Sequence, residues 1–174
     1  AMRFLIAPLL AILLTPSLHA MGKKPAPNRL TFHVQGHQSE GAKMVFPHAV
    51  YGKTIYFRRS PELFTKDLTS FKPFVADDGT YGATFYLSKV ARQRFAAVTT
   101  QHQKSWCIAM LNGRPLDAVM IDKPVNDGQS VVWQGLQKIE VNRFDLMIPR
   151  AGDSKEMWTL RKKVIKEKLK KAKK

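Results

Sequence analysis

The chain has 174 residues, and once a predicted signal segment is set aside it is about one domain in size, with enough apolar residues to close one core. Its 29 Lys and Arg against 13 Asp and Glu give a net charge of +16, which favours anionic partners. Cys107 is the only cysteine, which excludes an intramolecular disulfide.

The N-terminal segment has the pattern of a secretory signal peptide. Arg3 supplies the positive charge, and the apolar run 4–14 is shorter than the roughly 20 residues that a spanning helix needs. Ala20 is the small residue that a signal peptidase requires, so we expect cleavage after it and a mature chain that begins at Met21. Residues 1–20 therefore predict export to the periplasm, the outer envelope or the medium, and their prolines disfavour a retained anchor.

The next residues are predicted to form a flexible leader followed by strands. Residues 21–29 are polar and broken by proline, and 30–35 alternate between apolar and polar. The run 53–58 is rich in β-branched and aromatic residues. The runs 71–76 and 80–87 flank the sequence Asp-Asp-Gly, which predicts a hairpin.

Prolines interrupt this region at two places. We expect Pro47 to stop the short apolar run 44–46. Ser60 and Pro61 fit the cap and the first position of a helical turn.

The second half of the domain has a different order of elements. Asn112 and Gly113 supply the positive-φ positions of a tight turn between two strands. The predicted elements are a helix at 89–102, strands at 106–111, 116–121 and 130–133, and a helix at 136–148. Because no βαβ alternation runs through the chain, the sequence predicts an α+β fold. We expect a single domain over 30–150, an antiparallel sheet with two helices packed on one face.

The segment 151–174 is predicted to be a basic amphipathic tail with a helix. Between residues 155 and 174, ten Lys and Arg stand against two Glu. Apolar residues recur there at helical spacings: Met157, Leu160, Val164, Ile165 and Leu169.

Two interpretations of the tail remain open: a helix docked on the domain, or an arm that binds anionic lipid or another polyanion. Nucleic acid is not expected as a partner of an exported chain. The candidate residues for binding an anionic surface are Arg161, Lys162, Lys163, Lys166, Lys168, Lys170 and Lys171.

An enzyme is the alternative hypothesis, either a small hydrolase or a metal-dependent enzyme. It would use histidines or Cys107, which lies in an apolar run where a free thiol behaves as a small hydrophobe. His33 and His37 would share a face of a strand but lie about 13 Å apart, too far to bind one ion. We therefore predict no catalytic residue, no metal site and no cofactor.

The stretch 88–148 resembles the head subdomain of the large periplasmic domain of SecD, a membrane subunit that assists protein export. The matching positions are Thr99 at the end of a helix, Ile108 to Gly113, Leu116 to Ile121, Asp127-Gly128, Val132 to Gly135 and the helix 136–148. Asn112 stands where the family usually has Asp, and Val119-Met120 replace the usual Ala-Pro. The resemblance implies a non-enzymatic exported envelope protein that binds polypeptides or other envelope proteins.

Overall fold

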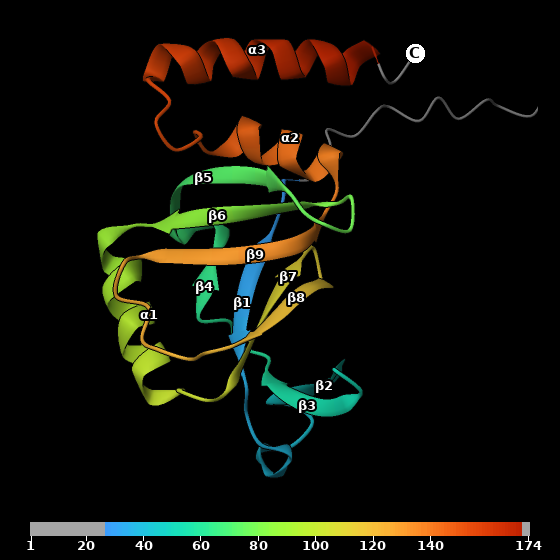
Figure 1. The fold of residues 1–174 in the computed structure, drawn as a ribbon, viewed down its shortest axis with the longest axis vertical. Coiled ribbons are helices and arrows are strands. Elements are labelled where there is room, and N and C mark those ends of the chain that lie inside the picture. Colours follow the sequence, from blue (N-terminus) through green and yellow to red (C-terminus); the bar gives the residue numbers. More distant parts are fainter. Residues whose placement is uncertain (1–26, 172–174) are drawn as a thin grey trace, which may run out of the picture.

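The computed structural model describes residues 27–171 (Figure 1). The predicted signal peptide and leader residues 21–26 lie outside these residues. The described part of the predicted leader is fixed: Asn28 is buried and donates to the Glu140 carbonyl at 2.7 Å, and the Arg29 amide donates to the Asn112 side chain at 2.9 Å. The folded domain thus includes the end of the predicted leader.

The α+β class is confirmed: within residues 27–171, antiparallel strands combine with three α-helices, of which the last is rich in Lys and Arg. The strands are β1 (Leu30–Val34), β2 (Val45–Val50), β3 (Lys53–Arg58), β4 (Leu63–Phe64), β5 (Leu68–Val75), β6 (Tyr81–Leu87), β7 (Trp106–Leu111), β8 (Arg114–Met120) and β9 (Gln129–Leu136). The α-helices are α1 (Lys89–Gln101), α2 (Lys138–Met147) and α3 (Lys155–Lys171). None of these helices combines the length and the apolarity that crossing a bilayer requires.

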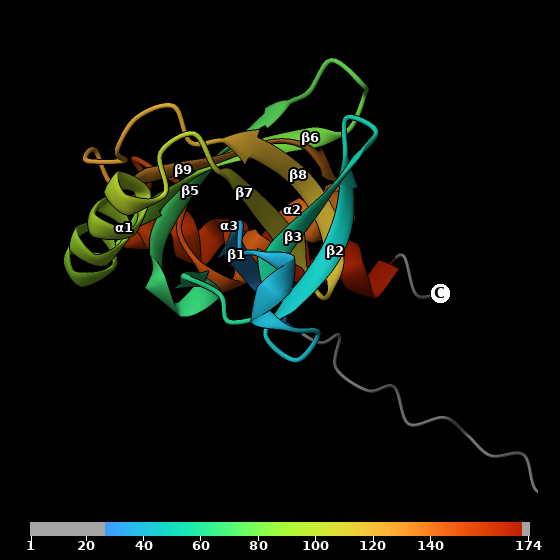
Figure 2. The same ribbon diagram turned by 90° about the horizontal axis from the view of Figure 1, so that it is seen from below.

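The strands form three sheets instead of the one predicted. One has the order β4-β1-β7-β8, the second has the order β5-β6-β9, and β2 pairs with β3 alone. The two larger sheets stay separate because β8 and β9 are not paired: the Trp133 amide donates to the Asp117 carboxylate, where a paired strand would offer a carbonyl. The β2–β3 hairpin lies on the opposite side of β1 from α1 (Figure 2).

Two predictions made from prolines are wrong. β2 continues through Pro47, because β2 pairs only with β3 and a proline is tolerated at a free strand edge. Ser60 and Pro61 begin no helix and lead directly into β4. The Asn112-Gly113 turn has the expected positive φ values of 54° and 83°.

Aromatic side chains from the strands and both inner helices fill one core. The Phe144 ring of α2 lies 5.2 Å from the Phe85 ring and 5.8 Å from the Phe71 ring, measured between centroids. Phe95 of α1 lies 6.5 Å from Phe32 of β1. Because α1 and α2 contact the same core, they fix the two larger sheets relative to each other.

Candidate functional site

The predicted anion-binding residues lie on α3, which packs on the side of α2 away from the strands (Figure 1). Two of them have partners: Arg161 contacts residues that precede α3 in the chain, and Lys162 contacts a side chain of α3 itself. Arg161 is paired with Asp153 at 2.7 Å, and the Lys162 ammonium lies 3.8 Å from the centre of the Trp158 ring. The other predicted residues are exposed: Lys163, Lys166, Lys168, Lys170 and Lys171.

A cluster of ion pairs holds the start of α3 against α2. Asp145 is fully buried and accepts two hydrogen bonds from Arg150, at 2.7 and 2.9 Å. Arg161 binds Asp153 through two nitrogens and lies 3.8 Å from Asp145. The hydrogen bonds from Arg161 hold the pKa of Asp153 below its ordinary value. The Trp158 indole N–H donates to the Asp145 carbonyl at 2.8 Å, so α3 is docked rather than free.

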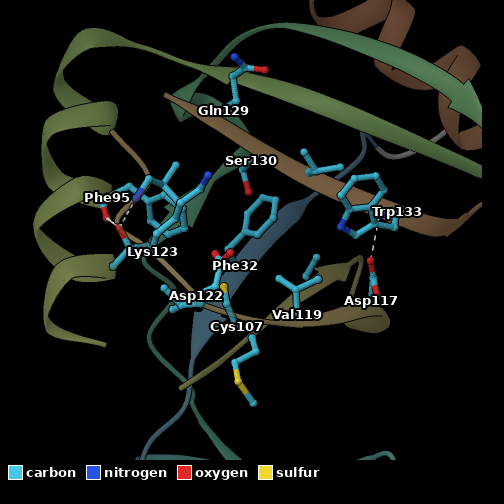
Figure 3. Close-up of a pocket in the computed structure, with 16 residues that line it drawn as sticks. Phe32, Phe95, Cys107, Asp117, Val119, Asp122, Lys123, Gln129, Ser130 and Trp133 are labelled. Atoms are coloured by element: carbon cyan, nitrogen blue, oxygen red, sulfur yellow. Dashed lines mark hydrogen bonds between the residues drawn. The ribbon is translucent and has the colours of Figure 1, made fainter. Parts of the chain in front are cut away.

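A second candidate site is a cleft of about 400 Å³ between β8 and β9, the facing edges of the two larger sheets. Figure 3 shows Phe32 at its centre, with Asp117 and Trp133 at one end and Phe95 at the other. Val119 and the neighbouring small residues of β7 complete a largely apolar lining. Such a lining suits an apolar side chain brought in by a ligand.

The backbone of β9 presents hydrogen-bonding groups to this cleft. The Trp133 amide donates to Asp117 at 2.9 Å and the Gln129 amide to Asp127 at 3.0 Å, so both amides point away from β6. Val131 lies between them, and the alternation of an antiparallel strand directs its N–H and C=O to the same side. Within residues 27–171, no backbone hydrogen bond joins β8 to β9. This edge is therefore free to pair.

The edge of β8 is arranged in the same way. The Ile121 amide donates to the Ser105 carbonyl at 2.9 Å. Ile121 and Ser105 therefore occupy a hydrogen-bonded position at the end of the antiparallel ladder between β8 and β7. The alternation then directs the backbone groups of Ala118 and Met120 away from β7. The cleft thus lies between two strand edges.

The cleft is closed at the end where β9 meets β8. Arg114 donates to the Gly135 carbonyl at 3.1 and 3.2 Å and also pairs with Glu140 at 2.9 Å. Gly135 has a φ of +91°, and a Cβ there would lie 3.2 Å from the Leu116 carbonyl oxygen. Only glycine permits this approach without strain.

The opposite end is held by α1. Thr99 is fully buried, and its hydroxyl donates to the Phe95 carbonyl at 2.8 Å and accepts from the Val125 amide at 2.9 Å. Arg92 donates to the Asn126 carbonyl at 2.7 Å. These bonds fix the loop between β8 and β9, so both ends of the cleft are rigid while its middle is open.

The residues named for the enzyme hypothesis are not brought together. His33 is buried and bonded through one ring nitrogen to the Arg58 carbonyl and through the other to the Thr31 hydroxyl. Burial lowers the pKa of His33 and raises the pKa of the Cys107 thiol to about 12, which keeps both groups neutral at pH 7. Among the described residues, no three His, Cys, Asp or Glu are placed to hold a metal ion.

The cleft was not predicted from the sequence. The structure exposes Trp133 at 59% and Met120 at 51% on two edge strands, and the related signal in the sequence is weak. In the run 129–133, Val131 and Trp133 occupy the positions that a half-buried strand usually gives to polar residues. The Asp117 side chain accepts from the Trp133 amide between β8 and β9. Strand propensity does not reveal this contact.

No family model and no curated protein matches the sequence. Among solved structures, the chain is similar to one described as a membrane component SecDF that enhances protein export, with 18% identity and a TM-score of 0.47 over 66% of this chain and 58% of that one. It is also similar to SecDF in a super-membrane-facing form, with 18% identity and a TM-score of 0.46 over 65% of this chain and 17% of that one. The chain thus spans less than two thirds of either protein's length. At these TM-scores we base neither fold nor function on the similarity, and the match of 88–148 to the SecD head stays a prediction.

Proposed function

We propose that this chain is a non-enzymatic binding protein of the cell envelope whose cleft takes up an extended polypeptide segment. The segment adds as a strand along the free edge of β9. The main supporting observation is the coincidence of unpaired backbone groups at Val131 with an apolar cleft directly beside them. Backbone pairing gives affinity without selecting a sequence, and the cleft selects the side chains that enter it.

Strand geometry defines the polypeptide that would fit. Side chains of an added strand alternate between the two faces of the sheet. On the inner face they would enter the cleft toward Phe32, and on the outer face they would lie beside Trp133, whose ring packs on Phe74 at 6.2 Å. The fit is best for a segment with an apolar residue at every second position.

The protonation of Cys107 and the hydrogen bonds of His33 favour a binding role over catalysis. Nucleophilic attack requires a thiolate, and burial keeps Cys107 in the thiol form. A general base must reach a substrate proton, and both ring nitrogens of His33 already have partners inside the protein.

The edge can be tested with a proline. Val131→Pro removes the amide that faces the cleft, and proline is tolerated at a strand edge. The probe is a fluorescent five-residue peptide of alternating valine and serine, the length of the open edge 129–133, and binding is followed by fluorescence anisotropy. We expect its dissociation constant to rise about tenfold, since each lost edge hydrogen bond contributes about 0.5–1.5 kcal/mol.

Val131→Thr is the matched control, because threonine keeps both the β-branch and the amide. It should bind as the unchanged protein does, and thermal unfolding should show that both variants are folded. Failure of the unchanged protein to bind the peptide, or equal binding by the two variants, would contradict the proposal.

Export is proposed from the pattern of residues 1–20 alone. N-terminal sequencing of the protein recovered from the envelope should give Met21 as the first residue. Recovery of a chain that still contains Met2 would show that the segment is not removed.

A further inference from the structure

The docked helix α3 leaves part of its apolar surface uncovered. Met157, Leu160 and Val164 are exposed at 53%, 65% and 49%, whereas Ile165 is exposed at only 6%. The first three residues follow each other at spacings of three and four, so they form one stripe along the helix. We call these three residues the α3 stripe.

The stripe cannot turn inward without breaking the contacts that dock the helix. Trp158 is bonded to α2 through its indole, and Arg161 is held by Asp153. Ser154 caps the helix, accepting from the Met157 amide at 3.2 Å. The rotation of α3 is therefore fixed, and its exposed apolar face is a permanent feature of the folded protein.

Positive charge borders the stripe. Lys168 and Lys171 follow Val164 by four and seven residues, which places them on the same side of the helix. The three residues of the stripe line a groove of about 510 Å³ between α3 and α2, and Lys138 and Lys168 line the same groove. The surface thus offers apolar side chains flanked by ammonium groups.

We propose that the α3 stripe docks on a bilayer that contains anionic phospholipid. The apolar residues enter the boundary between headgroups and acyl chains, and Lys168 and Lys171 bind the headgroup phosphates. Charge complementarity favours this partner, and the stripe favours a bilayer over a soluble polyanion, which has no apolar layer to receive it. The site is separate from the polypeptide cleft, since α2 lies between α3 and the strands (Figure 1).

The first test compares two charge reversals of equal size. Lys168→Glu with Lys171→Glu changes the side of the stripe. Lys155→Glu with Lys166→Glu changes exposed residues that lie about 160–200° around the helix from Val164. Binding to vesicles of phosphatidylcholine and phosphatidylglycerol is measured by sedimentation, with pure phosphatidylcholine vesicles as the control. We expect the first pair to weaken binding at least tenfold more than the second.

The second test removes the apolar contribution alone. Leu160→Ser with Val164→Ser leaves every charge in place and alters only exposed positions, so folding should be unaffected. Vesicle binding should weaken about tenfold or more while retention on heparin is unchanged. Equal losses from the two charge reversals, or full vesicle binding by the serine variant, would overturn the proposal. Native protein that binds heparin but no vesicles would overturn it as well.

Discussion

The neighbouring helices α2 and α3 differ in how they are held. α2 has ten residues and buries four of them, of which Val141 and Phe144 pack in the apolar core. α3 has 17 residues and buries only Ile165, and polar contacts from Trp158 and Arg161 do much of the docking. An amphipathic pattern therefore does not say which apolar residues become buried. A helix that is docked at a few points can keep an apolar face available for a partner.

The largest effect is expected in α2. Phe144→Ala should lower the free energy of unfolding by about 3–5 kcal/mol, because it leaves a cavity between the rings of Phe71 and Phe85. Urea unfolding followed by circular dichroism measures the change. A loss below about 1 kcal/mol would mean that the core refills the space and that α2 is held as loosely as α3.

A smaller loss is expected from the single buried residue of α3. Ile165→Ala should cost about 2 kcal/mol, the low end of the range for a buried isoleucine, because the site lies between two helices at the surface. Val164→Ala, one residue earlier and exposed, is the matched control and should change stability by less than about 0.5 kcal/mol. Equal losses from the two variants would show that α3 sits in another rotation.

As pH is lowered, α3 should detach from the domain before α2 does. Arg161 lowers the pKa of Asp153, so the stabilisation from this pair is complete above the unfolded pKa of about 4 and is lost as pH falls through the lower folded value. Exchange of the Trp158 indole N–H, measured by NMR, should therefore accelerate below about pH 4. The loss of stability that accompanies this step should be smaller than the loss caused by Ile165→Ala.

Asp153→Asn tests whether Asp153, and not another carboxyl group, causes the acid step. The variant should show faster exchange of the Trp158 indole already at neutral pH, and the acid step should be reduced. A full acid step in the variant would assign the effect to another carboxyl group.

The order and type of most elements could be predicted from local patterns. The predicted helix 89–102 matches α1, the predicted strand 106–111 matches β7, and the Asn112-Gly113 turn has the geometry that its chemistry requires. These features depend on neighbours in sequence, such as the Ser88 side chain that caps α1 by accepting from the Ala91 amide. Local periodicity and capping therefore specify them.

The cleft could not be predicted, because it depends on contacts between distant residues. At one end of the cleft, Asp117 accepts a hydrogen bond from the Trp133 amide, 16 positions away in the sequence. The ion pair between Arg161 and Asp153 is likewise not indicated by a charge count. The remaining lysines of α3 stay a prediction, and the structure adds that only some of them lie beside the apolar stripe.

The smallest expected effect concerns the lysines of α3. The Lys162 ammonium lies 3.8 Å from the centre of the Trp158 ring, and a cation over an aromatic face contributes about 0.5–1 kcal/mol at an exposed site. Lys162→Gln should therefore lower stability by about 0.5 kcal/mol in urea unfolding, whereas Lys163→Gln, exposed and one residue later, should have no measurable effect. Equal stability of the two variants would mean that the contact between Lys162 and Trp158, which lies within α3, adds nothing to stability. Lys162 would then join the solvent-facing lysines, and the contacts of Ile165, Trp158 and Arg161 alone would hold α3.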